Sequence, residues 1–245
     1  MSKFFVEPKN IGEQYIKITS KEDIHHLSKV LRLKIGDDID ISDSLTWDYK
    51  AEITSINEKE VTLKILDKQK FSREPGIKVT LFQGIPKAGK MDIIVQKCVE
   101  MGVYSIVPVL MDRTIVVDKG NFEKKISRWQ KISDESVKQC KRGIIPEIKT
   151  TQNFDKSIKD LSSFDLVIFP YENESKYTIK NCLRSLTQKP KNVAIIIGPE
   201  GGFSEKEVLS LDAINAQTVT LGKTILRTET AGVITLAMIM YELEL

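Results

Sequence analysis

A glycine-rich loop that contains one carboxylate is the stretch of this sequence whose residue types most clearly could do chemistry. Residues 195–204 read IIIGPEGGFS, an apolar strand that runs into the loop and then into a helix opened by Ser204 and Glu207. Backbone amides gather at such a helix N-terminus, as they do where a protein holds a phosphate. Glu200 lies in the middle of the loop, however, and its charge would repel an anion. The loop therefore favours a ligand other than a phosphate.

A second glycine loop follows about twenty residues later, in the segment LGKTILRTETA at 221–231. Its GKT imitates the end of a Walker motif, but the first glycine of that motif would fall on Gln217. The apolar pair Ile225 and Leu226 is expected to cover something flat. A ligand with hydroxyl groups and a positive charge, such as S-adenosylmethionine, fits both loops. The alternative for the first loop is a tight turn in which Glu200 only accepts backbone hydrogen bonds.

Five apolar runs are expected to position these loops in an α/β domain. They are continuous, as in strands buried on both faces of a parallel sheet. Because each glycine loop follows a strand, both should lie at the carboxyl edge of that sheet. The runs are 78–83, 105–110, 165–170, 192–197 and 217–221, and helices are predicted at about 90–101, 121–142, 176–187, 204–214 and 229–243.

The first part of the chain has a different pattern. Short strands with period-two alternation surround one predicted helix at about 21–31, and two of them form a hairpin around residues 57–59. This pattern is typical of a small β-barrel. The polar segment 67–77 carries Pro75-Gly76, so we predict a domain boundary that gives domains 1–72 and 73–245.

Composition limits the class of protein. The chain has 245 residues, of which 41% are hydrophobic and 29% charged, as in ordinary soluble globular proteins. Its longest nearly apolar run, 231–241, is shorter than the roughly 20 residues of a membrane span. Three scattered cysteines and two adjacent histidines disfavour a disulfide framework, a zinc site and a His-based triad. We expect a cytoplasmic protein without a metal.

Positive charge concentrates in one region. The net charge is only +3, yet residues 113–149 hold ten basic and five acidic residues. On the predicted helix 121–142 the charges follow one stripe and the apolar residues the opposite face. The alternative to RNA contact is that the charges only form the solvated face of the helix, which is the explanation that applies to most helices. The stripe comprises Lys124, Arg128, Lys131, Glu135, Lys138 and Arg142.

The two glycine loops together resemble the signature of the SPOUT (trefoil-knot) methyltransferases. In detail the chain is similar to the RsmE group, which methylates uracil N3 in small-subunit ribosomal RNA with S-adenosylmethionine. The resemblance extends over nearly the whole chain, through HHLSKVLRLKIGD at 25–37, KMDIIVQKCVEMGV at 90–103, RWQKISDESVKQCKRGIIPEI at 128–148 and FPYENE at 169–174. It implies an α/β protein with a small N-terminal PUA-like β-barrel, a C-terminal SPOUT domain with a deep trefoil knot, and a homodimer.

Loop position, charge and the resemblance together suggest roles for particular residues. Arg227 and Arg142 would stabilise the uracil anion, and Glu200 would orient one of them or accept the proton. RNA contacts are expected from Lys3, Arg32, Lys34, Lys124, Arg128, Lys131 and Lys138. Cofactor contacts are expected from Pro170, Tyr171, Glu172, Ile197, Gly198, Pro199, Gly201, Gly202, Leu221, Gly222, Ile225, Leu226 and Thr228.

The sequence departs from the family pattern at Lys3, at Ala88 and at 111–114, which bears on RNA contacts more than on the cofactor. The last helix is apolar on nearly every side, so it is either internal or part of the dimer interface. The expected partner is 16S ribosomal RNA or the small ribosomal subunit. Alternatives are a SPOUT enzyme that acts on another RNA, and a non-catalytic ribosome-assembly factor that binds RNA.

Overall fold

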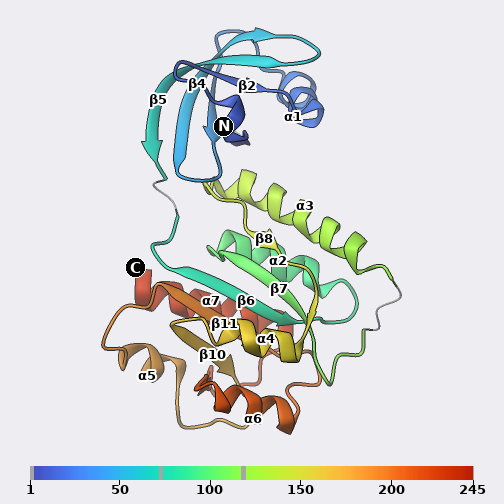
Figure 1. Cartoon of the computed structure of the whole chain (residues 1–245), viewed down its shortest axis with the longest axis vertical. Helices are drawn as coiled ribbons and strands as arrows, with labels where there is room; N and C mark the ends of the chain where they lie inside the picture. The colour runs from blue at the N-terminus through green and yellow to red at the C-terminus, as the bar shows by residue number, and fades with distance from the viewer. Residues whose placement is uncertain (1–2, 72–73, 117–119, 245) are drawn as a thin grey trace. The chain divides into compact units, whose positions relative to one another are not determined.

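The computed structural model describes residues 3–71, 74–116 and 120–244. The chain forms two compact units (Figure 1). The N-terminal unit comprises Met1–Glu74 and Val137–Ile145, and the C-terminal unit comprises Pro75–Ser136 and Pro146–Leu245. The predicted boundary after residue 72 falls on residues 72–73, which lie outside the described part. No sequence pattern predicts that 137–145 belongs to the first unit.

The N-terminal unit is built on a five-stranded sheet in the order β1-β3-β4-β5-β2. β1 pairs with β3 in parallel, and the other pairs are antiparallel. The predicted hairpin is confirmed, because the Asn57 amide donates to the Glu60 carbonyl at 3.0 Å between β4 and β5. The strands are β1 (Lys3–Phe5), β2 (Tyr15–Ile18), β3 (Asp38–Ser42), β4 (Trp47–Ile56) and β5 (Val61–Lys70).

The predicted helix of this unit is shorter and less regular than expected. α1 (Lys21–His25) begins where the Ser20 side chain accepts a hydrogen bond from the Asp23 amide. A π-helical turn, η2 (His26–Val30), continues it. The helix packs on a core of alternating strand residues that includes Ile39, Ile41, Ile53 and Leu63. A short 3₁₀ helix, η1 (Pro8–Asn10), precedes β2.

Polar contacts fix the segment Val137–Ile145 within the N-terminal unit. The Ser42 hydroxyl donates to the Gly143 carbonyl at 2.6 Å. Glu74 accepts hydrogen bonds from the amides of Gly143, at 2.7 Å, and Ile144, at 3.1 Å. A Cβ atom on Gly143 would lie 2.5 Å from the ring of Phe71, so only glycine fits this contact. The segment is therefore an integral part of the unit.

The C-terminal unit contains a seven-stranded sheet in which every described pair is parallel. Its order is β12-β10-β11-β6-β7-β8, with β9 also paired to β7. The five predicted apolar runs are the strands β6, β7, β10, β11 and β12, so the predicted parallel sheet is confirmed. The strands are β6 (Lys78–Gly84), β7 (Ser105–Leu110), β8 (Glu147–Ile148), β9 (Gln152–Asn153), β10 (Leu166–Pro170), β11 (Asn192–Ile197) and β12 (Gln217–Val219).

Helices cover both faces of this sheet (Figure 1). α2 (Lys90–Glu100), α5 (Ile179–Arg184) and α7 (Thr228–Glu244) pack together on one face, and α4 (Phe154–Leu161) and α6 (Glu205–Ala213) pack on the other. The sequence does not predict α4. α3 (Phe122–Cys140) begins in this unit, and its last turn belongs to the N-terminal unit. Within the described residues, no helix has the length and apolar character needed to cross a membrane.

Candidate active site

The loops that follow β10, β11 and β12 meet at the carboxyl edge of the sheet. The Tyr171 amide, just after β10, donates to the carbonyl of Val219 at the end of β12, at 3.0 Å. The Glu172 carboxylate lies beside the β11 loop, since a Cβ atom on Gly202 would be 3.5 Å from its Oε1. All three loops expected to hold the cofactor are therefore neighbours, as the strand-end rule requires.

The loop after β11 is packed tightly against β6 and the start of α7. The Thr228 hydroxyl donates to the Gly198 carbonyl at 2.7 Å and accepts from Gln83 Nε2 at 2.9 Å. A Cβ atom on Gly84 would lie 2.6 Å from the Pro199 nitrogen. Thr228 is the first residue of α7, and its buried side chain positions the glycine loop.

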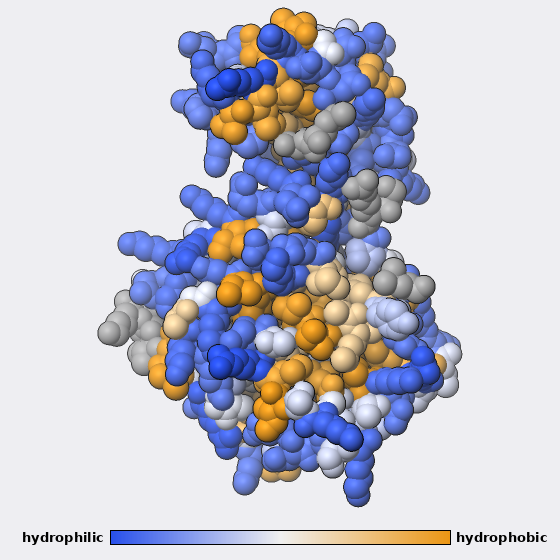
Figure 2. Space-filling model, turned by 180° about the vertical axis from the view of Figure 1, so that it is seen from behind, coloured by the Kyte–Doolittle hydropathy of each residue, from blue (hydrophilic) through white to orange (hydrophobic). Residues whose placement is uncertain are grey.

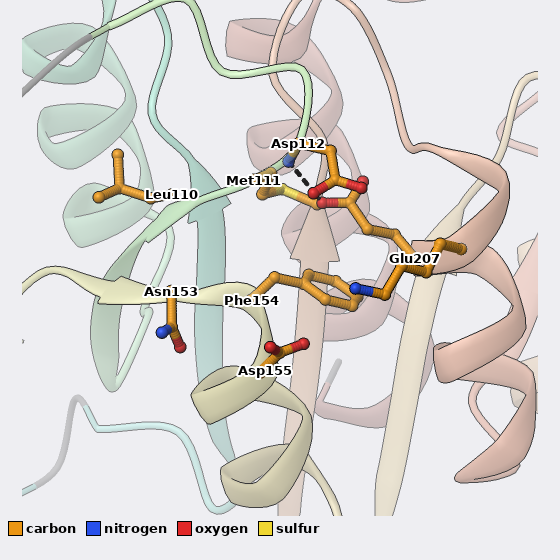
Figure 3. Close-up of a pocket in the computed structure, with 8 residues that line it drawn as sticks. Leu110, Met111, Asp112, Asn153, Phe154, Asp155 and Glu207 are labelled. Atoms are coloured by element: carbon orange, nitrogen blue, oxygen red, sulfur yellow. Dashed lines mark hydrogen bonds between the residues drawn. The ribbon is translucent and has the colours of Figure 1, made fainter.

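The predicted capping box at the start of α6 is confirmed, with Ser204 and Glu207 as its two members. The same residues bind the segment after β7. Glu207 Oε1 accepts from the Asp112 amide at 2.8 Å (Figure 3). The Ser204 hydroxyl donates to Asp112 Oδ2 at 2.6 Å. Arg113 Nη1 donates to the Gly201 carbonyl at 2.8 Å. The segment 111–114 therefore fixes the glycine loop from one side.

A cavity of about 200 Å³ lies behind this junction, between the end of β7 and the N-termini of α4 and α6 (Figure 3). Three carboxyl groups, from Asp112, Asp155 and Glu207, line it, which disfavours an anionic ligand. None of the residues predicted to bind the cofactor lines it. The cavity is lined by Leu110, Met111, Asp112, Asn153, Phe154, Asp155, Lys206 and Glu207.

Glu200 has a partner that the sequence did not indicate. Its Oε1 atom accepts from the Lys87 amide at 3.2 Å and lies 3.1 Å from Lys90 Nζ. The same Nζ atom lies 3.1 Å from Oε2 of Glu229. Burial raises the pKa of Glu200, but hydrogen bonds from backbone amides and from Lys90 outweigh it, so the pKa lies below its ordinary value. A carboxylate with a lowered pKa is a weak proton acceptor, which argues against Glu200 as the base.

The loop between β12 and α7 exposes the residues predicted to contact ligands. Gly222 has a φ of +137°, in the region that favours glycine. Ile225 is 80% exposed, and Leu226 is half-buried. Arg227 is exposed, and within the described part of the chain its guanidinium has no hydrogen-bond or ion-pair partner. An exposed apolar side chain and an exposed cation are thus available together at the sheet edge, and the charge of Arg227 also helps to lower the pKa of the nearby Glu229.

Comparison with known proteins identifies the family. An RNA methyltransferase domain model matches residues 73–240, and an RNA methyltransferase PUA domain model matches residues 18–66. Ribosomal RNA small subunit methyltransferase E of Bacillus subtilis is 32% identical over 251 residues, which cover 100% of this chain and 98% of the relative. The chain belongs to the RsmE family.

Two solved structures resemble this RsmE family member along its length. RsmE of Neisseria gonorrhoeae bound to S-adenosylmethionine is 28% identical with a TM-score of 0.86, covering 98% of this chain and 97% of that one. A methyltransferase of Legionella pneumophila in complex with the same cofactor is 29% identical with a TM-score of 0.83, covering 98% and 96%. The predicted fold class, a PUA-like domain followed by a SPOUT α/β domain, is confirmed, and the trefoil knot stays a prediction.

Two predicted contacts of this RsmE chain need correction, because both side chains are buried in ion pairs of the N-terminal unit. Arg142 is 4% exposed, and its Nη2 lies 2.8 Å from Glu74 Oε2. Lys3 is 4% exposed, and its Nζ lies 2.7 Å from Asp48. The side chain of Lys3 is therefore not available to RNA phosphates. The guanidinium of Arg142 binds Glu74 of the same unit and is not available to a substrate.

Other predicted RNA-binding residues of the family member are exposed. Lys124 and Lys131 lie on the solvent side of α3, while Trp129 on the opposite side is 5% exposed. Arg32 and Lys34 are exposed in the N-terminal unit. Among the residues that the structure describes, these four cations have no ion-pair partner, so a contact with phosphates would break no ion pair there.

Two further cations of the predicted stripe already have acidic partners. Arg128 pairs with Asp92 of α2, and Lys138 lies 3.7 Å from Asp23. Arg128 nevertheless keeps 67% of its side chain exposed. Because an exposed ion pair is weak, Asp92 reduces a contact of Arg128 with RNA without preventing it. The Lys138–Asp23 pair is largely buried, with side chains 25% and 18% exposed, and makes Lys138 a poorer candidate for RNA contact.

Glu174 makes the loop after β10 sensitive to acid. Hydrogen bonds from the amides of Tyr177, at 3.0 Å, and Lys176, at 2.7 Å, lower its pKa below the ordinary value of 4.5. The stability that they contribute is complete above pH 4.5 and is lost as pH falls through the folded pKa. Glu174→Gln should therefore lower the melting temperature at pH 7 and have a smaller effect at pH 3. Thermal unfolding at both pH values, with the exposed Glu205→Gln as control, tests this, and an equal loss at both would contradict it.

Proposed function

We propose that this chain methylates N3 of a uridine near the 3′ end of 16S ribosomal RNA in the cytoplasm, with S-adenosylmethionine as methyl donor. The observation that carries the proposal is similarity over the full chain to RsmE proteins, including one bound to S-adenosylmethionine. The three neighbouring loops at the sheet edge give this similarity a physical basis.

The residues at the sheet edge fit this cofactor. Glycines allow close approach of the main chain, since a Cβ atom on Gly198 would lie 3.1 Å from the carbonyl carbon of Gly202. The Glu172 carboxylate beside Gly202 can accept hydrogen bonds from ribose hydroxyls. Ile225 and Leu226 can cover the adenine. When bound, the cofactor supplies a methyl group on a positively charged sulfonium, and Glu172 favours that charge.

Arg227 has the properties needed at the reacting base. Uracil N3 must lose its proton before it can attack a methyl group, and negative charge then spreads to the adjacent carbonyl oxygens. An exposed cation without a partner can stabilise this charge, and it does so best when it is already in place. N3 also lies on the base-pairing edge, so the uridine must be unpaired or extruded. We assign Arg227 this role and no longer assign Arg142 a part in it.

The exposed cations of α3 and of the N-terminal unit supply the RNA contact in this proposal. Phosphate contacts of Lys and Arg position an RNA without reading its sequence. Lys124, Lys131, Arg32 and Lys34 are the residues that we assign to it, with Arg128 as a weaker member.

The surface of α7 supports a homodimer. Tyr241 is 70% exposed and Ile93 of the adjacent α2 is 55% exposed, while Val233, Ala237 and Met238 of α7 are half-buried. Figure 2 shows apolar side chains gathered on the face of the C-terminal unit that carries this helix. A contiguous apolar area of this kind marks an interaction site. We propose that a second copy of the chain covers it.

Mass spectrometry tests the proposed activity. Purified protein and S-adenosylmethionine are incubated with small ribosomal subunits or with 16S RNA that lack the modification, and the RNA is digested to nucleosides. We expect one N3-methyluridine per 16S RNA. Calorimetry with S-adenosylmethionine should show stoichiometric binding. Binding of RNA without the cofactor would favour an assembly factor, and methylation of a ribose or of another RNA would contradict the proposed substrate.

A further inference from the structure

Lys90 has no role in the proposed chemistry, but it connects the glycine loop after β11 with the first turn of α7. Lys90 is the first residue of α2, and its Nζ atom lies 3.1 Å from Glu200 and 3.1 Å from Glu229. Glu200 belongs to the glycine loop after β11, and Glu229 to the first turn of α7. The three side chains are only 18–23% exposed, so solvent screens the ion pairs less than it would on an open surface.

The turn before α2 has an unusual backbone that brings Lys90 to Glu200. Ala88 has a φ of +56° and Gly89 a φ of +71°. A left-handed conformation is strained for a residue with a Cβ atom, such as alanine. Packing does not impose it, because both residues are exposed and a Cβ atom on Gly89 would meet no atom within 4 Å. Two contacts with Glu200 accompany this turn. The Lys87 amide donates a hydrogen bond to the Glu200 carboxylate, and Lys90 forms an ion pair with it.

The same lysine also reaches the segment that carries Arg227. The amides of Thr230 and Ala231 donate to the Arg227 carbonyl at 2.9 and 2.8 Å, so the main chain of Arg227 is part of the first turn of α7. Glu229 lies within that turn and holds it to Lys90. A shift of Lys90 would therefore change the position of Arg227 relative to the glycine loop.

We propose that Lys90 is a positioning residue for methyl transfer, which fixes the glycine loop at Glu200 and the first turn of α7 at Glu229 in one arrangement. The inference rests on the proposed function. Two carboxylates already compensate the charge of Lys90, which makes it a poor phosphate contact. Its effect on the reaction runs through the placement of Arg227 against the cofactor loop.

Lys90→Met tests this, with Lys97→Met as the matched control. Lys97 is on the same helix, and its ion pair with Glu100, at 2.9 Å, stays within that helix. We expect Lys90→Met to lower kcat by about 10- to 100-fold, because small misplacements of catalytic groups have effects of this size. KM for the RNA should stay unchanged, and Lys90→Arg should restore most of the rate.

The double variant with Arg227→Ala separates positioning from a general loss of structure. If Lys90 acts through Arg227, kcat of the double variant should equal that of Arg227→Ala alone, since groups that act as a unit are not additive. Losses that multiply, or a Lys90→Met rate equal to that of Lys97→Met, would overturn the proposal. If Lys90→Met does not fold, Glu229→Gln breaks the same link, and an unchanged kcat there would also overturn it. An inactive parent protein would instead contradict the proposed function.

Discussion

Arg227→Ala should lower kcat of methyl transfer by about 100- to 1000-fold, the usual cost of removing one preorganised group that stabilises charge in the transition state. Dissociation constants for S-adenosylmethionine should stay close to those of the parent, because the cofactor is expected on main-chain atoms of the neighbouring loops. Arg227 is exposed and makes no hydrogen bond or ion pair within the described residues, and Glu229, whose pKa it helps to lower, keeps its ion pair with Lys90 when the arginine is removed. Folding should therefore be unaffected.

Single-turnover rates with saturating cofactor, together with calorimetry, measure both parts of this expectation. Lys159→Ala is a suitable control, because Lys159 is an exposed cation on α4, on the opposite face of the sheet. Arg227→Lys should recover part of the rate, since a cation remains but the planar guanidinium is lost. A rate for Arg227→Ala that matches the control would remove Arg227 from the mechanism.

Gly84→Ala should both weaken cofactor binding and destabilise the C-terminal unit. Its new Cβ atom would lie 2.6 Å from the Pro199 nitrogen and 2.8 Å from Met111 Sδ, so the loop after β11 must move. Overpacking of this kind costs about 1–3 kcal/mol of unfolding free energy. Pro199 directly follows Gly198 in the chain. A movement of Pro199 therefore also displaces the residues that are predicted to contact the cofactor.

Denaturant unfolding and calorimetry with S-adenosylmethionine measure the two effects of Gly84→Ala. Gly76→Ala provides the comparison, because its Cβ atom would meet only the flexible end of Glu244, at 3.4 Å. Gly76→Ala should leave cofactor affinity unchanged. Unchanged affinity in Gly84→Ala would show that the glycine loop tolerates the shift and does not form the cofactor site.

Sequence patterns correctly predicted strands and helix caps, which depend on residues close to one another in the chain. The apolar runs became five parallel strands, and Ser204 with Glu207 formed the expected capping box, because each relies on residues close in sequence. α4 was missed although Asn153 caps it and its apolar residues Phe154, Ile158 and Leu161 recur at helical spacing, because the pattern spans only eight residues. The strand-end rule also brought the glycine loops together correctly.

Long-range ion pairs account for what the sequence did not predict at the site. Glu200 was expected to orient an arginine or accept a proton, yet its partner is Lys90, which lies on another element far away in the chain. Arg142 was placed on a helical stripe by its spacing, but the helix ends at Cys140 and Glu74 binds the guanidinium. Periodicity cannot show which of several charged residues will meet.

The return of Val137–Ile145 to the N-terminal unit affects the order in which a nascent chain can fold. Domains usually form from the N-terminus as translation proceeds. Here Glu74 and Ser42 lack their partners Gly143 and Ile144 until the ribosome has made 145 residues and released them from its exit tunnel. By then β6 and β7 have also emerged, so the first unit cannot be completed before the second has begun.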